Sequence, residues 1–387
     1  MNKPALRRLD SPLVSFLITT IVVSVFTFAM LFRSGFDASS FVTAGDRNCD
    51  PALVPDKLVV IKNSAGYDGQ FYYRLALDPF TSRRTDFGVT LDIPSFRHQR
   101  ILYPFLAWVL SVGNAGLVPW MMLFINYSAL CLLGWLGGVY AQAFKQHALW
   151  GLFLPLFPAS LMSLTRDLVE GLEVSLLVSS LLLLRRGKHV WGGALLTLAV
   201  LTKESALIVA GAATLSYFAC RLRGITDCIR WQYFTPPIVT FLIWQTALFF
   251  NWQELPVLAG KMNIGIPFSG LFSFLLDAAT FQTPLQRRSF PELILLIIFA
   301  FGVMWRLRST DASAHEVLSW FLYVALALSY SRVIWVEDWA YLRAVSEFCV
   351  LGMIIVIGSG SRIKAMILGS FSILWLFIFL RLLRHGD

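Results

Sequence analysis

Long apolar runs alternate with short polar segments along most of the chain. A transmembrane helix needs roughly 17–25 mainly apolar residues to cross a hydrocarbon layer that is about 30 Å thick. The pattern therefore predicts transmembrane helices, with soft boundaries where the runs are short. The predicted spans cover residues 12–33, 117–144, 148–164, 168–184, 236–250, 291–305, 315–331, 343–359 and 363–380.

A further apolar stretch, residues 190–219, is too long for one plain span, and Thr202, Lys203 and Glu204 interrupt it. Non-helical backbone at membrane depth is tolerated only where it is buried or lines a wet cavity. We therefore expect a hairpin or a broken pair of half-helices with its tip at Lys203 and Glu204. The predicted fold class is an all-α polytopic membrane protein of about ten transmembrane helices, folded as a single domain over residues 1–387.

The largest polar segment, residues 34–116, separates the first two spans. Here the pattern predicts a short helix from Gly69 to Leu77 that stops at Asp78, because the following proline restricts the residue before it. Residues 97–112 begin with basic side chains and continue with apolar ones, which is typical of a helix that lies on the membrane surface. We expect a large loop with two short interfacial helices.

The composition supports a membrane protein. Hydrophobic residues make up 57% of the chain and charged residues 14%, whereas a soluble domain carries about 25% charged residues. The first apolar run follows Lys3, Arg7 and Arg8, but it is too long for a cleaved signal and no cleavage site follows it. The five cysteines and five histidines show no metal-ligand spacing, so no metal site is predicted, and a divalent cation stays open as a cofactor.

Basic residues indicate the orientation, because cytoplasmic segments of membrane proteins are enriched in lysine and arginine. With the N-terminus inside, the predicted inner segments carry 14 of the 32 basic residues and four of the 23 acidic residues. The loop 34–116, Arg166, the tip at Lys203 and the segment 331–343 then lie outside. The basic excess is a topology signal rather than a sign of nucleic-acid binding. We expect a bacterial inner membrane, with these segments on its periplasmic face.

Asp68 lies in the stretch GYDGQFYYRLALDPF, residues 66–80, at the predicted start of a helix. One interpretation is a helix cap, because an aspartate in this position accepts hydrogen bonds from backbone N–H groups. The other is a general base, because a carboxylate at the edge of a cavity accepts the proton of an attacking hydroxyl group. Gly69 would let a substrate approach the backbone, and Tyr67 and Tyr72 would either contact a sugar or lipid or form the loop core.

Ionisable residues near hydrocarbon are functional candidates, because they are costly to keep there. On the predicted outer face these are Arg74, Arg100, Arg166, Glu170, Lys203, Glu204, Arg332, Asp338 and Arg343. Each has a structural alternative. Arg166 and Glu170 have the spacing of a pair on one helix face, Lys203 and Glu204 would solvate a helix break, and Arg343 would anchor a span at the interface.

Two segments, YDGQFYYRLALDPF from Tyr67 onward and RILYPFLAW at 100–108, resemble the first outer loop of the GT-C superfamily of integral membrane glycosyltransferases. The branch related to the GPI mannosyltransferases is the most similar one. TRDLVEGLEVSLL at 165–177 and ALLTLAVLTKESALIV at 194–209 also resemble helices of that superfamily. The resemblance covers the arrangement of most of the chain, but its specific motifs are short, and Gly69 stands where many members have a second acid.

The resemblance implies inverting transfer of a sugar from a polyprenyl phosphate or pyrophosphate donor to a hydroxyl group of a glycan, lipid or protein acceptor. Asp68 would be the base, with Asp46 as the alternative. Arg74 and Arg100 would position Asp68, and Asp338 would contact the acceptor or neutralise an arginine. Basic outer residues would stabilise the leaving phosphate. The candidates for this role are Lys203, Arg166, Arg332 and Arg343.

Two other classes of function fit part of the pattern. A transporter or flippase for a lipid or small solute shares the many spans, the broken helix and the central charges. It does not need a large ordered loop with an aspartate on a short helix, and the sequence shows no internal repeat. A glycan polymerase or ligase uses similar donors but relies on arginine- and histidine-rich loops late in the chain. In the enzyme, Asp68 is expected to share a cavity with Lys203 and with Arg332 or Arg343.

Overall fold

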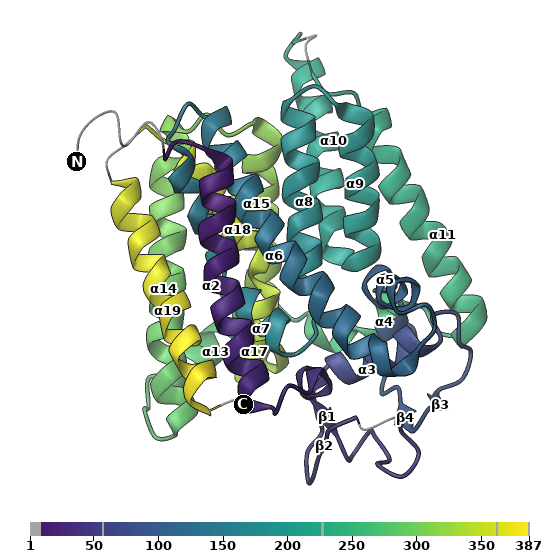
Figure 1. Ribbon diagram of the computed structural model, residues 1–387. Helices are drawn as coiled ribbons and strands as arrows, with labels where there is room; N and C mark the ends of the chain where they lie inside the picture. Colours follow the sequence, from purple (N-terminus) through teal and green to yellow (C-terminus); the bar gives the residue numbers. More distant parts are fainter. Residues whose placement is uncertain (1–8, 56–57, 226–227, 361–362, 386–387) are drawn as a thin grey trace.

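The computed structural model describes residues 9–55, 58–225, 228–360 and 363–385, which form an all-α protein with long helices side by side (Figure 1). Six helical segments within these ranges are long and apolar enough to cross a membrane. A bent pair, Ala148–Leu156 and Ala159–Thr165, adds a seventh if it counts as one span. The chain is therefore a multi-pass membrane protein. The six segments are Pro12–Arg33, Ala115–Ala143, Glu204–Leu222, Trp231–Trp252, Pro284–Ser309 and Lys364–Arg384.

The helices fall into a bundle and a set of shorter connecting elements (Figure 1). The bundle contains α2 (Pro12–Arg33), α6 (Val118–Ala143), α7 (Ala159–Thr165), α8 (Glu170–Arg185), α9 (His189–Thr202), α10 (Leu207–Leu222), α11 (Thr235–Trp252), α14 (Pro284–Arg306), α15 (Ala314–Leu328), α18 (Ser346–Ile357) and α19 (Lys364–His385). The shorter α-helices are α3 (Gly69–Leu77), α4 (Pro94–His98), α5 (Leu102–Ser111), α12 (Pro256–Ala259), α13 (Ser269–Ala278), α16 (Arg332–Val336) and α17 (Asp338–Ala344). The 3-10 helices are η1 (Ala38–Val42), η2 (Ala115–Leu117), η3 (Ala148–Leu156), η4 (Glu204–Ala206), η5 (Trp231–Phe234), η6 (Lys261–Asn263) and η7 (Leu307–Ser309).

The expected number of about ten spans exceeds the six or seven that length and composition support, because several apolar helices are short. α9, α15 and α18 have 14, 15 and 12 residues. All residues of α18 are buried. A helix that is apolar on every side and buried on every side packs against protein, so α18 does not need the full thickness of the bilayer.

The stretch 190–219 forms the expected broken pair of helices. α9 ends at Thr202, the backbone at Lys203 is extended (φ −154°, ψ 126°), and η4 leads into α10. Glu204 in the break forms a salt bridge with Arg100 of the loop between α2 and α6. The tip of the broken pair therefore meets this loop, as the charge pattern predicts.

The two ends of the bundle differ in their polar contacts. At one end, which we call the far end, Arg185 donates a hydrogen bond of 2.7 Å to the carbonyl oxygen of Asp311. At the other end, which we call the loop end, the elements α3, α4 and α5 gather beneath the bundle (Figure 1). Arg33 at the end of α2 donates to the carbonyl oxygens of Leu382 and Leu383, so the C-terminal part of α19 also lies at the loop end.

The prediction of a helix from Gly69 to Leu77 is confirmed by α3. The prediction of one helix over 97–112 is wrong, because α4 ends at His98 and α5 begins at Leu102. Pro104 explains the break. In a continuous helix its ring would clash with the carbonyl group of residue 100, whereas in the first turn of α5 its missing N–H group leaves no hydrogen bond unmade.

The loop also contains two minimal sheets that the sequence pattern did not indicate. β1 (Ala44–Gly45) pairs in parallel with β2 (Val60–Ile61), and β3 (Thr85–Asp86) pairs antiparallel with β4 (Val89–Thr90). Tyr72 of α3 and Tyr103 of α5 are both buried and meet edge to face, with ring centroids 6.0 Å apart. The loop is therefore an ordered layer with its own core, packed on the end of the bundle.

Candidate functional site

Asp68 is the residue before the first turn of α3, but it does not cap the helix. Its backbone is helical (φ −58°, ψ −26°), and its side chain accepts no capping hydrogen bond. One carboxylate oxygen lies 2.8 Å from Nη1 of Arg97, and the other lies 2.9 Å from Nη1 of Arg343. The side chain of Asp68 is 20% exposed, so it can still be reached from outside the protein. The capping interpretation therefore does not explain this residue.

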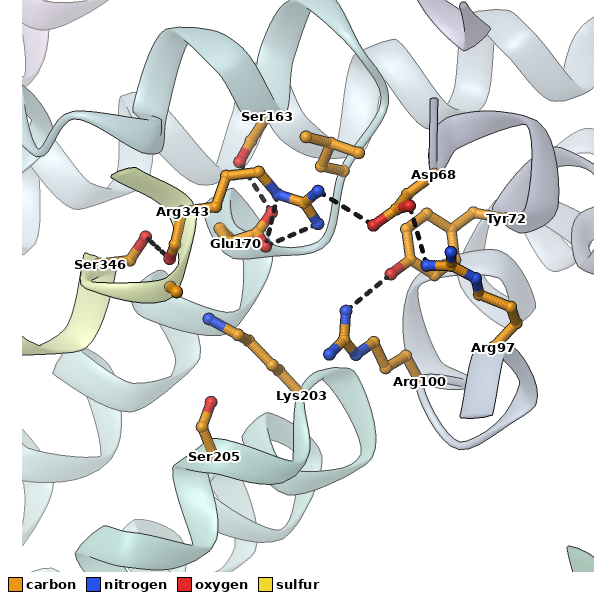
Figure 2. Close-up of polar contacts among 12 residues, drawn as sticks. Asp68, Tyr72, Arg97, Arg100, Ser163, Glu170, Lys203, Ser205, Arg343 and Ser346 are labelled. Carbon is orange, nitrogen blue, oxygen red and sulfur yellow. Dashed lines mark hydrogen bonds and ion pairs between the residues drawn. The ribbon is translucent and has the colours of Figure 1, made fainter. Parts of the chain in front are cut away.

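Asp68 is the centre of a chain of five alternating charges, which we call the ionic chain: Asp92, Arg97, Asp68, Arg343 and Glu170. Nε and Nη2 of Arg97 bind the carboxylate of Asp92 at 2.9 and 2.7 Å. Nε and Nη2 of Arg343 both lie 3.0 Å from Oε1 of Glu170. Each arginine thus uses two nitrogen atoms on its own anchoring acid and the third on Asp68. Figure 2 shows this arrangement for Arg343.

The charge of Asp68 is strongly favoured in this arrangement. Burial by itself would raise the pKa of Asp68, but the positive charges of Arg97, Arg343 and Arg100 outweigh it and hold this pKa well below its ordinary value. A carboxylate with such neighbours stays ionised throughout the physiological pH range. It is also a weak proton acceptor for as long as both guanidinium groups remain in place.

A second pair of charges links the loop to the broken helices. Arg100 binds both carboxylate oxygens of Glu204, at 2.7 and 3.0 Å, and donates to the hydroxyl group of Tyr72 at 3.2 Å. On the other side of the break, Lys203 lies 2.9 Å from Oε1 of Glu347. In Figure 2, Arg343 is turned toward Asp68 and Glu170, and Arg100 is turned toward Tyr72. The charges of Arg343, Lys203 and Arg100, from three separate elements, all act on Glu170, and those of Arg343 and Arg100 also act on Asp68.

Aromatic rings fix some of these groups in position. The ring of Tyr67 lies between the guanidinium groups of Arg166 and Arg343, at 5.2 and 5.1 Å from the ring centroid. Arg166 also lies over Trp339, at 4.3 Å. Such cation–π contacts are worth about 0.5–2 kcal/mol each, with the upper value for desolvated groups. The alternative in which Arg166 and Glu170 pair on one helix face does not hold, because α7 ends at Thr165 and α8 begins at Glu170, whose carboxylate binds Arg343 of α17.

Gly69 has a packing role rather than the expected role in substrate access. A Cβ atom at this position would lie 2.3 Å from the carbonyl oxygen of Arg166 and 2.7 Å from that of Val42. The space next to Gly69 is thus filled by the protein backbone. The glycine lets the start of α3 approach α7 and η1 closely, and this approach brings Asp68 to the ionic chain.

Several predicted site residues lie elsewhere. Asp46 is exposed, and its carboxylate accepts hydrogen bonds from the backbone N–H groups of Asn63 and Ser64, which lower its pKa. Arg332 pairs with Asp277, and the two side chains are 60% and 43% exposed. Asp46 is therefore a poor candidate for the base, because its carboxylate closes a turn. Arg332 is a poor candidate for a phosphate ligand, because its ion pair is exposed to solvent.

Two further predicted site residues, Arg74 and Asp338, have different outcomes. Arg74 is completely buried in the loop, where it donates to Thr81 at 2.9 Å, lies 3.7 Å from Asp86 and stacks on Phe87. This arginine stabilises the loop and does not contact Asp68. Asp338 begins α17, but its side chain lies outside the described part of the structure.

Sequence reasoning missed Arg97, Asp92 and Glu347. Glu347 carried a usable signal, because it is an acid within an apolar run, where ionisable residues are costly and rare. Glu173, one helical step beyond Glu170 on the predicted polar stripe, is buried like Glu347, and no described residue binds either of its carboxylate oxygens. Arg97 and Asp92 carried no such signal, because charged residues are common in loops.

Neither of two cavities found in the structure is lined by Asp68. One, of about 350 Å³, lies at the far end beside Arg185, Tyr217 and His315. The other, of about 450 Å³, lies in the loop beside Asp78 and Trp108. Among the described residues, no group of three or more His, Cys, Asp or Glu side chains is arranged to hold a metal ion. Of the residues expected to share a cavity with Asp68, Arg343 contacts it directly, whereas Lys203 binds Glu347, and the shared cavity stays a prediction.

Comparison with protein families, curated proteins and solved structures finds no match for this chain. Any functional assignment must therefore rest on the chemistry of the site itself.

Proposed function

We propose that the chain is a membrane glycosyltransferase of the GT-C type. It would move a sugar from a polyprenyl-phosphate-linked donor to a hydroxyl group of a glycan, lipid or protein acceptor, on the outer face of a bacterial inner membrane. The observation that carries this proposal is the carboxylate of Asp68 held against Arg343, next to a glutamate, Glu170, on which the charges of Arg343, Lys203 and Arg100 all act. In such a transfer, a base and a phosphate site must lie close together, because the acceptor attacks the carbon that bears the phosphate.

The proposed roles follow from charge. Asp68 accepts the proton of the acceptor hydroxyl group, and the acceptor oxygen forms a bond to the anomeric carbon of the sugar. The bond from that carbon to the phosphate oxygen breaks, and the polyprenyl phosphate leaves with the electron pair. Arg343, Lys203 and Arg100 stabilise its negative charge, as preorganised cations do in a water-poor site.

The test is a comparison of lipid-linked and surface glycans by mass spectrometry in three strains. These carry the wild-type protein, a deletion, or Asp68→Asn at equal protein level. We expect the deletion to lose one glycan, which would identify the transferred sugar, and Asp68→Asn to reproduce that loss. If the deletion loses a glycan and Asp68→Asn keeps it, Asp68 is not the base. An unchanged glycan profile in the deletion strain would contradict the enzyme itself.

A second candidate function, transport of a lipid or small solute, is favoured by Glu173. This carboxyl group is buried in α8, and no described residue binds its oxygen atoms. Unpaired acids inside membrane bundles are typical of ion and proton pathways. The transporter would lose substrate movement in Glu173→Gln with an unchanged glycan profile. If the chain is the enzyme, Asp68→Asn changes the glycan profile and Glu173→Gln leaves it unchanged.

A further inference from the structure

The two arginines of the ionic chain are held in place independently of Asp68. Arg97 is fixed by Asp92 through two hydrogen bonds and lies over the ring of Phe71, 4.5 Å from its centroid. Arg343 is fixed by Glu170 and by the ring of Tyr67. Both side chains are largely buried, with 12% and 9% of their surface exposed. The two Nη1 groups are thus preorganised donors with a fixed separation.

The carboxylate of Asp68 bridges these donors with one oxygen on each, at 2.8 and 2.9 Å. Two N–H groups that bind two oxygens of one anion form the arrangement by which arginines also bind phosphate. Asp68 forgoes the capping hydrogen bonds that its position in front of α3 offers. Its carboxylate therefore sits as an anion in a site that two anchored cations define.

We infer that Asp68 occupies, in the ligand-free protein, the site that binds the phosphate group of the substrate lipid, and that the phosphate displaces it. This inference rests on the proposed function, because that function supplies the phosphate. The displaced carboxylate loses both guanidinium partners and becomes a stronger proton acceptor. The base is thus released only when a donor is bound, which protects the site from activating a hydroxyl group when no sugar is present.

When the phosphate displaces Asp68, one anion replaces another at the two arginines, and the number of N–H···O contacts stays the same. Two N–H···O contacts from Arg97 and Arg343 to Asp68 break, and two to phosphate oxygens form. Asp92 and Glu170 remain on the arginines throughout, so neither guanidinium group is left without an anion. No proton moves in this step. The later proton transfer from the acceptor hydroxyl group to Asp68 belongs to the sugar transfer.

The test is the affinity of the purified full-length protein for farnesyl phosphate, a short polyprenyl phosphate, measured by isothermal titration calorimetry in detergent. Asp68→Asn removes the competing charge, so this variant is expected to bind about tenfold more tightly, which corresponds to about 1.4 kcal/mol. Asp68→Ser should shift the affinity in the same direction. Arg343→Gln should bind at least about tenfold more weakly.

A matched control is Asp277→Asn, which removes an acid from an arginine pair at the exposed surface and should leave the affinity unchanged. Farnesol and inorganic phosphate are the ligand controls. Tighter binding of inorganic phosphate to Asp68→Asn assigns the effect to the head group, whereas equal binding of farnesol and farnesyl phosphate would overturn the site.

Several results would overturn the inference. If Asp68→Asn binds farnesyl phosphate as well as the wild type, or more weakly, Asp68 supports the anion site and does not compete for it. If neither the wild type nor this variant binds, the site is not a phosphate site. The inference and the proposed function also fail separately. If Asp68→Asn binds farnesyl phosphate more tightly but the wild type transfers no sugar, only the proposed enzyme is contradicted. If transfer depends on Asp68 but Asp68→Asn does not bind more tightly, only the displacement is contradicted.

Discussion

Two arginine–glutamate pairs with a buried glutamate lie at opposite ends of the bundle, and they differ in what surrounds them. At the far end, Arg185 binds Glu316 at 3.0 Å. Glu316 also accepts the N–H group of Ser313 at 2.6 Å and completes a capping box at the start of α15. The hydroxyl group of Tyr140 donates to the same glutamate. Each of these contacts of Glu316 either joins two helices or caps the start of α15.

At the loop end, Arg343 and Glu170 form a similar pair, but Asp68 adds a third charge that no helix requires. Asp68 comes from the loop, avoids its own cap and binds two arginines from different elements. Buried ion pairs are weak evidence of stabilisation, because desolvation offsets much of their attraction. The comparison indicates that the far-end pair is structural, whereas the ionic chain holds charges that local structure does not explain.

The largest expected effect separates activity from stability at the loop end. Asp68→Asn should lower the rate of sugar transfer in membrane vesicles about 10³-fold, as removal of a general base does. The thermal stability should fall only slightly, because both arginines keep Asp92 and Glu170. Rate and melting temperature are measured on the same preparations. If the transfer rate falls only in proportion to the amount of folded protein, the role of the ionic chain is structural.

At the far end, we expect a substitution to lower the stability and to leave the specific activity unchanged. Glu316→Gln keeps a side chain suited to the capping box but leaves Arg185 without its anion, so the free energy of unfolding should fall by about 3 kcal/mol. Thermal unfolding in detergent measures the loss. The folded fraction should retain the specific activity of the wild type. A fully stable variant without activity would show that the far-end pair is functional.

A smaller effect concerns pH and the loop. His98 is buried in α4, where Nε2 donates to the carbonyl oxygen of Pro79 at 2.7 Å and Nδ1 accepts from the indole of Trp252 at 3.0 Å. Burial lowers the pKa of His98 to about 4, whereas an unfolded histidine has a pKa of about 6.5. The unfolded state therefore binds more protons between these values.

The stabilising contribution of neutral His98 is complete above pH 6.5 and decreases as the pH falls toward 4. Between pH 8 and pH 5 the loss should be about 2 kcal/mol. Protease sensitivity of the loop and thermal unfolding across this range measure it. His98→Gln should flatten the dependence, since glutamine does not titrate. An equal slope in wild type and variant would assign the pH effect to other groups.

The smallest expected effect is at the surface. Arg332→Gln breaks the exposed pair with Asp277, and such pairs contribute about 0–1 kcal/mol. The melting temperature and the rate of sugar transfer should both stay close to those of the wild type. A large loss of transfer would restore Arg332 as a phosphate ligand and would require the site to extend toward α13 and α16.

The class of protein, the broken helices at Lys203 and the helix from Gly69 to Leu77 can all be predicted from the chain's residue pattern alone. These features depend on local patterns: the length of an apolar run, a polar interruption within it and a proline that ends a helix. The same logic identified Glu170, Lys203 and Arg343 as candidates, because a charge within or beside an apolar run stands out, and Asp68 was identified by its place at the start of a short helix.

Which of these charges meet depends on how distant segments of the chain fold together. Asp68 and Arg343 are 275 residues apart in the sequence, and no local pattern encodes the approach of α3 to α17. The pattern also missed Arg97 and Asp92, since charged residues in a polar loop look alike until the loop folds. The sequence pattern also gave too much weight to Arg332, because the exposure of a side chain depends on packing between distant segments.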